Sequence, residues 1–165
     1  MKVFIKSRKS IFPVYTQIEV DLSCTDSKYL HIFTDGGGNC GKTSIGIVIV
    51  ESGKVTTTFG AFLGNKSTNN IAELTSIYKA LRLVKHLKKP VRIYSDSAYA
   101  VYSLCKIFNG RKNTELINEI IEYIKKYPVQ VEFVKIKGHS GIEFNDYADS
   151  IASSLLKYQE KKNDM

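Results

Sequence analysis

Four carboxylates are spread along this chain. Each lies either where one predicted element gives way to the next or at the edge of the apolar face of a predicted helix. They are Asp35, Glu73, Asp96 and Asp149. Carboxylate oxygens are the hard ligands that Mg²⁺ prefers, and several of them brought together by folding can support metal-assisted phosphodiester hydrolysis. The sequence therefore suggests a divalent-metal site, provided that the fold makes the four residues converge.

Each carboxylate also has a simpler interpretation. Asp35 precedes the glycines 36–38, where aspartate is common in turns. Glu73 lies within about 40° of the apolar stripe of a predicted helix, where an unpaired carboxylate is costly; a basic partner or the helix dipole would also account for it. Asp96 suits a helix N-cap, and Asp149 suits a solvated helix face. Position alone leaves these alternatives open.

A histidine in a glycine-flanked setting lies in the segment Gly138-His139-Ser140-Gly141, which ends about two helical turns before Asp149. Histidine titrates near neutral pH and can shuttle protons when it lies beside carboxylates. His139 is therefore a candidate catalytic residue, although most loop histidines have no such role.

Composition restricts the class of protein. The net charge of +8 and the pI near 9.3 favour a polyanionic partner such as nucleic acid or an acidic membrane surface. No apolar run approaches the roughly 20 residues that span a bilayer, and the N-terminus lacks the apolar region of a secretion signal. Cys24, Cys40 and Cys105 are odd in number and far apart, which indicates reduced thiols. We therefore expect a cytoplasmic or other nucleus-accessible intracellular protein that is not secreted and does not bind a membrane.

The carboxylates would be positioned by a mixed set of elements. Alternating and β-branched patterns predict strands at residues 29–35, 44–51, 54–63, 91–95 and 129–136. Helical periodicity predicts helices at residues 69–87, 97–108, 113–127 and 144–158. Short turns join the first three strands, the glycines after Asp35 are expected to end the first of them, and helices separate the later strands. This order predicts an α/β fold with a mixed five-stranded sheet, three antiparallel strands followed by parallel ones, and helices on both faces.

The chain divides into three regions. Residues 1–28 form an N-terminal extension with two strand-like segments around Pro13, predicted as a hairpin that either joins the main sheet or forms a separate flap. Residues 29–158 form the main domain. Residues 159–165 are predicted to be a polar tail.

Four motifs occur in a characteristic order: FTDGGGN, TNNIAEL, IYSDSAYAV and KGHSGIEFNDYAD. With the elements between them they resemble type 1 ribonuclease H over residues 29–158. The resemblance implies that Asp35, Glu73, Asp96 and Asp149 bind metal and that His139 is the mobile-loop histidine of the family. The spacing from this histidine in the family selects Asp149 rather than its neighbour Asp146.

The resemblance also implies a set of substrate-binding positions: Gly36, Gly38, Asn39, Cys40, Thr68, Asn69, Asn70 and Asn145. Thr68 and the two asparagines after it would hold a DNA-strand phosphate at a helix N-terminus, which is a favourable anion site. Asn39 and the backbone beside it would face the RNA 2′-hydroxyls, which distinguish RNA from DNA.

The activity implied by the resemblance is hydrolysis of the RNA strand of an RNA·DNA hybrid by two Mg²⁺ ions, with Mn²⁺ as an alternative, leaving 5′-phosphate and 3′-hydroxyl ends. The expected partner is the hybrid duplex, and the expected state is a monomer. Three alternatives stay open: another nuclease of the same fold, a non-catalytic hybrid- or RNA-binding module, and one domain of a reverse transcriptase.

The chain departs from many bacterial members of the family in two ways. It lacks the basic, tryptophan-rich handle, since IFNGRKNTELI closes that gap and the chain contains no tryptophan. In this it resembles handle-less members, including retroviral domains. The glycine-rich loop is also shorter than in many relatives. The substrate must then be gripped elsewhere, and the candidate is the N-terminal extension with its cations Lys2, Lys6, Arg8 and Lys9. For the extension itself, an edge hairpin without a binding role is the favoured interpretation.

Overall fold

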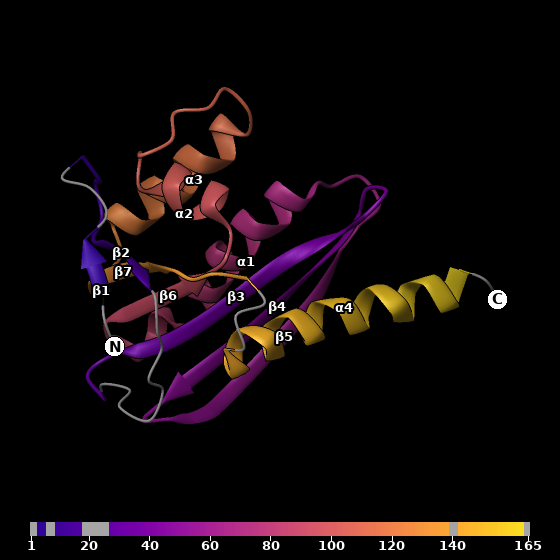
Figure 1. The fold of residues 1–165 in the computed structure, drawn as a ribbon, viewed down its shortest axis with the longest axis horizontal. Helices are drawn as coiled ribbons and strands as arrows, with labels where there is room; N and C mark the ends of the chain where they lie inside the picture. Colours follow the sequence, from indigo (N-terminus) through magenta and orange to yellow (C-terminus); the bar gives the residue numbers. More distant parts are fainter. Residues whose placement is uncertain (1–2, 6–8, 18–26, 139–141, 164–165) are drawn as a thin grey trace.

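One mixed sheet forms the centre of the molecule. The computed structural model describes residues 3–5, 9–17, 27–138 and 142–163, so His139 lies outside the described residues. Within them, seven strands form a single sheet in the order β1-β2-β7-β6-β3-β4-β5 (Figure 1). The predicted five-stranded sheet corresponds to β3 to β7, and the α/β fold class is confirmed.

Three long antiparallel strands form one side of this sheet: β3 (Leu30–Asn39), β4 (Lys42–Glu51) and β5 (Lys54–Gly64). The turn between β4 and β5 is Ser52-Gly53, and both residues have positive φ, 50° and 78°. Two such residues match the twist of a tight hairpin, so the two-residue turn predicted from the sequence is confirmed.

The glycine run does not end β3, contrary to the sequence-based prediction. The strand continues through Gly36 and Gly38 to Asn39. Glycine is needed because other backbone lies too close for a side chain: a Cβ on Gly36 would lie 2.5 Å from the carbonyl carbon of Ala72, and one on Gly38 would collide with the carbonyl oxygen of Lys42.

Parallel strands complete the sheet. Strand β6 (Val91–Ser95) pairs with β3, and β7 (Val131–Lys135) pairs with β6. The N-terminal extension joins the same sheet: β2 (Val14–Gln17) pairs parallel with β7, and β1 (Val3–Ile5) pairs antiparallel with β2. The extension is therefore an edge addition rather than a separate flap.

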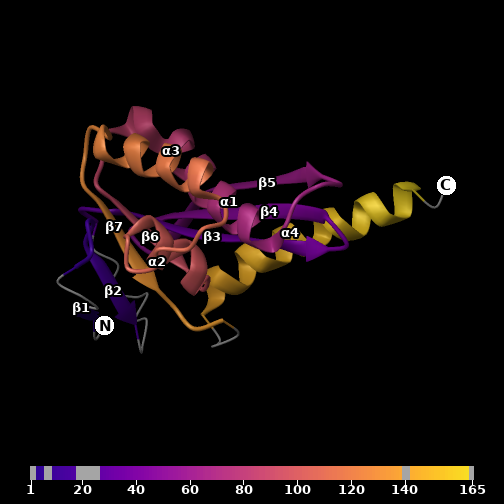
Figure 2. The ribbon, with the colours of Figure 1, turned by 90° about the horizontal axis from the view of Figure 1, so that it is seen from above.

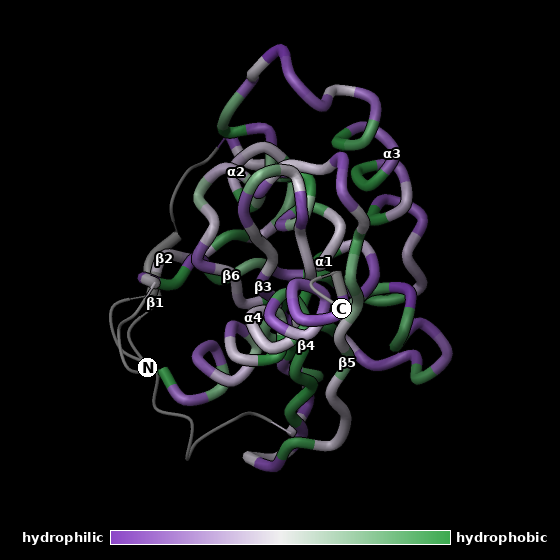
Figure 3. Tube along the Cα trace, turned by 90° about the vertical axis from the view of Figure 1, so that its right-hand side faces the viewer, coloured by the Kyte–Doolittle hydropathy of each residue, from purple (hydrophilic) through white to green (hydrophobic). Residues whose placement is uncertain are grey.

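Helices cover both faces of the sheet (Figure 2). One face carries α1 (Asn69–Val84), continued by a 3-10 turn at Lys85–Leu87, with α2 (Ala98–Leu104) and α3 (Thr114–Lys125); the other carries α4 (Glu143–Asn163). Adjacent strand residues point to opposite faces, so Ile32 packs in the core beneath α1 and Phe33 in the core beneath α4. Hydrophobic residues follow the strands, and hydrophilic ones follow the outer turns (Figure 3).

Two helix boundaries differ from those predicted. Helix α2 ends at Leu104, because the amide groups of Ile107 and Phe108 turn back to the carbonyl of Tyr102. Helix α4 continues through residues 159–163, where a polar tail was predicted. Glutamine, glutamate and lysine are good helix formers, and terminal lysines complement the helix dipole, so this segment stays helical without burying an apolar face. No helix in the described part of the chain is long and apolar enough to cross a membrane.

Candidate active site

Three carboxylates meet at the centre of the sheet. One oxygen from each of Asp35, Glu73 and Asp96 lies within 4.8 Å of the others. Strand register places two of them: Phe33 pairs with Tyr94 across the parallel strands β3 and β6, so Asp35 and Asp96 stand at matching positions two residues further on. The approach of α1 to Gly36 brings Glu73 against the same point, because a Cβ on that glycine would lie 2.8 Å from the Glu73 amide nitrogen.

The fourth carboxylate, Asp149, reaches the cluster from the other face of the sheet. Asp35 pairs with Gly46 on β4, and a side chain on Gly46 would collide with the carbonyl oxygen of Ala148. This glycine therefore lets α4 pack directly on the sheet, with Asp149 lining the same cavity as Asp35 and close enough to raise its pKa. All four predicted carboxylates converge, although Asp149 lies outside the tightest group of three. Asp146 lines the same cavity but is exposed.

The structure removes the simpler interpretations of Asp35 and Asp96, and the basic partner suggested for Glu73. Asp35 lies within a strand rather than a turn. Asp96 does not cap α2, because the Ser97 hydroxyl accepts the hydrogen bond from the Ala100 amide at 3.0 Å. Glu73 has no salt bridge within the described residues, and its buried Oε2 has no hydrogen-bond partner.

Burial and mutual repulsion raise the proton affinity of the cluster. Burial, with the charge of Asp35 and a hydrogen bond to it, raises the pKa of Glu73 to about 10. Burial raises the pKa of Asp35 to about 7, supported by the hydrogen bond with Asp149 and the charge of Asp96 and opposed by the hydrogen bond from Glu73. Carboxylates crowded in this way bind either protons or a cation, because a cation relieves the repulsion that protons otherwise relieve.

The donor set fits a hard divalent cation. Its ligands are carboxylate oxygens, one buried oxygen of Glu73 lacks a partner, and the cluster opens into a cavity of about 240 Å³. Magnesium and manganese take such ligands, whereas zinc sites usually include histidine or cysteine. Of the cysteines that the structure describes, Cys40 is exposed and Cys105 is buried, and neither lines this cavity.

The substrate-binding positions expected from the sequence lie beside the cavity. Gly36 and Gly38 line it, and the hairpin tip at Asn39 and Cys40 follows on exposed backbone. The amide of Ser67 donates to the carbonyl of Gly41 at 3.0 Å, which ties this hairpin to the start of α1.

At the start of α1, the Thr68 hydroxyl accepts from the Ile71 amide at 3.2 Å and caps the helix, leaving Asn69 and Asn70 exposed in the first turn. Asn145 lines the cavity from α4; it is 3% exposed, and its Oδ1 has no partner. Sequence patterns gave no sign of the other α4 residues in this wall, namely Ala152, Ser153 and Leu156.

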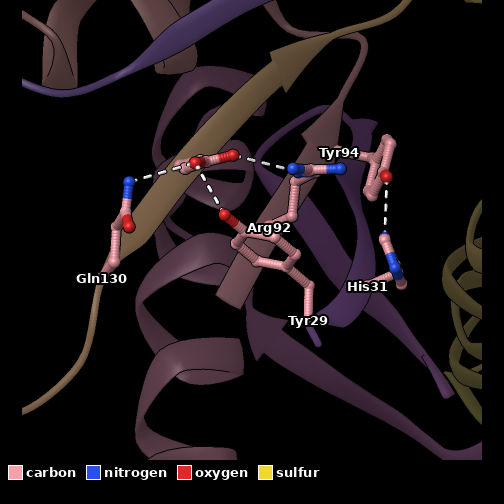
Figure 4. A network of polar contacts seen from close by, with 6 residues as sticks. Tyr29, His31, Arg92, Tyr94 and Gln130 are labelled. Atoms are coloured by element: carbon pink, nitrogen blue, oxygen red, sulfur yellow. Dashed lines mark hydrogen bonds and ion pairs between the residues drawn. The ribbon is translucent and has the colours of Figure 1, made fainter. Parts of the chain in front are cut away.

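A polar network that the sequence analysis missed braces the strands leading to the site (Figure 4). Its members are Tyr29, His31, Arg92, Tyr94, Gln130 and Glu132. Glu132 accepts hydrogen bonds from Tyr29 at 3.2 Å, Gln130 at 3.0 Å and Arg92 at 3.0 Å. Tyr94 bonds His31 at 2.8 Å and stacks on Phe33 with ring centroids 4.4 Å apart. The network thus joins β3, β6 and β7 immediately before Asp35 and Asp96.

Comparison with known proteins identifies this arrangement. The RNase H family model matches residues 24–157, which include the four carboxylates. The chain belongs to the ribonuclease H family. Among curated relatives, the ribonuclease H of Clostridium botulinum is 33% identical over 150 residues, covering 78% of this chain and 96% of that protein. The ribonuclease H of Syntrophomonas wolfei is 32% identical over 146 residues, covering 79% and 97%.

Solved structures give the same result. The crystal structure of LC11-RNase H1 in complex with an RNA/DNA hybrid superposes with a TM-score of 0.68 at 26% identity, covering 79% of this chain and 98% of that one. In the present ribonuclease H, residues 105–113 join α2 to α3 directly, without a helix of their own. This agrees with the resemblance to handle-less members of the family.

Proposed function

We propose that this ribonuclease H cleaves the RNA strand of RNA·DNA hybrids internally, leaving 5′-phosphate and 3′-hydroxyl ends. The observation that carries the proposal is the convergence of Asp35, Glu73, Asp96 and Asp149 on one cavity. Curated relatives that are matched over nearly their whole length are ribonucleases H, and a neighbouring structure holds an RNA/DNA hybrid.

The four carboxylates would hold two Mg²⁺ ions, with Mn²⁺ as an alternative. Bound divalent ions supply an activated water and stabilise charge on the leaving 3′-oxygen. Asp35 lies within β3, Asp96 follows the end of the adjacent strand β6, and Glu73 and Asp149 come from helices on opposite faces, so secondary structure positions all four carboxylates before a ligand arrives. His139, outside the described residues, is proposed to transfer a proton during cleavage.

Recognition of the two strands is assigned to separate elements. Gly36 and Gly38 have no side chains, so the RNA backbone can approach strand β3 closely, and Asn39 and Cys40 at the hairpin tip would face the 2′-hydroxyls. Thr68, Asn69 and Asn70 at the positive end of α1 would hold a DNA-strand phosphate. Asn145 offers its unpartnered Oδ1 to a group in the cavity. We further expect an intracellular enzyme that acts as a monomer.

Cleavage of matched duplexes tests the proposal. A hybrid, a double-stranded RNA and a double-stranded DNA of one sequence would be incubated with Mg²⁺ or Mn²⁺, and the product ends identified. We expect cleavage of the hybrid alone, in its RNA strand. Cleavage of double-stranded DNA would favour another nuclease of the same fold, and binding of the hybrid without cleavage would favour a non-catalytic module.

A further inference from the structure

The last turns of α4 project beyond the sheet. Figures 1 and 2 show the C-terminal part of this helix extending past the ends of the strands. We call residues 156–163 the α4 overhang. Its lysines, Lys157, Lys161 and Lys162, are all exposed. The proposed catalytic chemistry does not use this segment.

The overhang has a fixed direction because the preceding turns are anchored to the sheet. The Ser44 hydroxyl donates to the carbonyl of Ala152 at 2.5 Å. Gly60 leaves room for the next turn, since a Cβ there would lie 2.7 Å from Leu155 Cδ1. An uninterrupted helix that starts from these contacts holds its exposed end in a defined place relative to the carboxylates.

The cavity at the carboxylates extends toward this overhang. On the β3 side its wall is formed by Gly36, Gly37 and Gly38; on the α4 side the wall runs from Asn145 to Leu156, the first residue of the overhang. A strand of nucleic acid lying on the glycines and crossing the carboxylates would therefore pass along α4.

Charge is distributed unevenly along α4. The turns at the site carry Glu143, Asp146 and Asp149, whereas the overhang carries three lysines and a single acidic residue, Glu160. Lysines at a helix C-terminus also complement the dipole, and this alone would explain their presence. A role in binding requires that they lie on the side of the helix that borders the cavity.

Helical spacing places one of the lysines on that side. Lys157 follows Ser153, which lines the cavity, by four residues and is turned only about 40° from it. Lys161 is turned about 120° from Asp149 and so leaves that side. Lys162 comes seven residues after Leu155, and so shares the side that faces the sheet. Along the axis, Lys157 lies about 12 Å from Asp149 at 1.5 Å per residue.

We propose that the α4 overhang extends the hybrid-binding surface, with Lys157 contacting a backbone phosphate roughly three to four base pairs from the cleaved bond, taking about 3.4 Å per nucleotide. The overhang would supply part of the grip that other members of the family obtain from the basic handle. This inference rests on the proposed function, because it assigns the binding of the same substrate.

The test compares two single variants that each remove one positive charge from the overhang. Lys157→Gln removes the proposed phosphate ligand; Lys162→Gln is the matched control, an exposed lysine on the same helix. We expect the first variant to raise KM for a 20-base-pair hybrid several-fold with kcat unchanged, and to reduce the slope of log KM against log salt by roughly 0.9, the value for one phosphate that is no longer neutralised. The control should match the wild type.

Hybrid length gives a second readout. Shortening the hybrid to about three base pairs on the side of the cut that faces the overhang should remove the difference between the first variant and the wild type, because the phosphate that Lys157 binds would be absent. Equal KM values and salt slopes for both variants, or a difference that persists on the shortened hybrid, would overturn the proposal.

The two proposals fail in different ways. If the wild type cleaves the hybrid and the first variant has the same KM, the proposed function stands and this inference is contradicted. If the wild type does not cleave hybrid, the proposed function fails, and fluorescence anisotropy of a labelled hybrid still compares the variants. In that measurement, equal affinities of the two variants would contradict the inference, and weaker binding by the first alone would support it.

Discussion

Glu73 is the clearest physical sign of a metal site at the residue scale. It is 8% exposed, its Oε2 has no partner, and its neighbours in the cavity are other carboxylates. A buried acid without a basic partner destabilises a fold unless it holds a proton or a cation. The site thus gives up stability in the metal-free protein and recovers it when a cation binds.

Glu73→Gln should stabilise the metal-free protein at alkaline pH. The folded-state pKa is raised from 4.5 to about 10, so between these values the folded protein holds a proton that the unfolded chain releases, and the free energy of unfolding falls as pH rises. Glutamine cannot ionise and removes this loss. In EDTA at pH 8 we expect a gain of about 2 kcal/mol, or roughly 5 °C in Tm, vanishing below about pH 4.5. A difference that does not change with pH would contradict this account.

Asp149 and Asp146 allow the proposed metal ligand to be compared with a neighbouring acid. Both line the cavity, but Asp149 contributes to the raised pKa of Asp35, whereas Asp146 is exposed. Asp149→Asn should lower the rate of hybrid cleavage by at least about 10- to 100-fold, as loss of a group that supports a metal does. Asp146→Asn removes the same charge from the same helix and should change the rate only a few-fold. The opposite order in steady-state assays would transfer the ligand role to Asp146.

The residues of this site were predictable to different degrees. Glu73 could be singled out because helical periodicity put it beside an apolar stripe. The convergence of Asp35 with Asp96 depends on the register of Phe33 with Tyr94, which no local pattern encodes. This convergence could be expected from the sequence only because the order of the four motifs resembles that of a known family. The unpartnered Oδ1 of Asn145 and the network around Glu132 depend entirely on tertiary contacts.

At the scale of elements, glycines set how closely the helices approach the sheet. Gly36 admits the backbone of α1, and Gly46 admits the backbone of α4. Because Glu73 and Asp149 follow directly after the residues at these two contacts, Ala72 and Ala148, the spacing of the carboxylates depends on the missing side chains.

Gly46→Ala should therefore displace α4 and damage the site. The added methyl group would collide with the carbonyl of Ala148, and overpacking of this kind costs about 1–3 kcal/mol. We expect a lower Tm and, from the protein that stays folded, a lower rate of hybrid cleavage. Gly110→Ala is the control, since nothing lies within 4 Å of a Cβ there. If both variants kept wild-type Tm and rate, close packing of α4 would not be what positions Asp149.

The elements also show why sequence patterns fell short in places. The run Gly36–Gly38 has the composition of a turn, yet it continues β3 because close tertiary packing excludes side chains there. The end of α4 has the composition of a solvated tail, yet good helix formers extend a helix that is anchored one turn earlier. In both segments the local composition fits two states, and contacts with distant residues select one.

At the scale of the whole molecule, the N-terminal extension supports the sheet at an edge away from the site. The amide of Phe133 on β7 donates to the carbonyl of Pro13 at 2.9 Å, the rings of Phe12 and Phe133 lie 6.1 Å apart, and Val14 is buried. Strand β2 thus covers the edge of β7, while the carboxylates come from β3, α1, α4 and the end of β6. We propose that residues 29–158 carry the catalytic machinery and that residues 1–28 stabilise it.

Deleting residues 1–17 should lower Tm and promote aggregation, because it exposes the edge of β7. The deletion should leave kcat and the salt dependence of KM for the folded fraction near wild-type values. Thermal unfolding and a salt series of KM measure these effects. A salt slope that falls by roughly 0.9 for each phosphate left without its cation would instead show that the basic residues of the extension grip the hybrid.

The central claim is that the converging carboxylates cleave hybrids with the help of divalent ions. The most direct test measures cleavage of one labelled RNA·DNA hybrid in Mg²⁺ by the wild type and by Asp96→Asn, with far-UV circular dichroism to confirm equal folding. We predict RNA-strand cleavage by the wild type that EDTA stops, and its loss in a variant that is folded. Undiminished cleavage by Asp96→Asn would contradict the account.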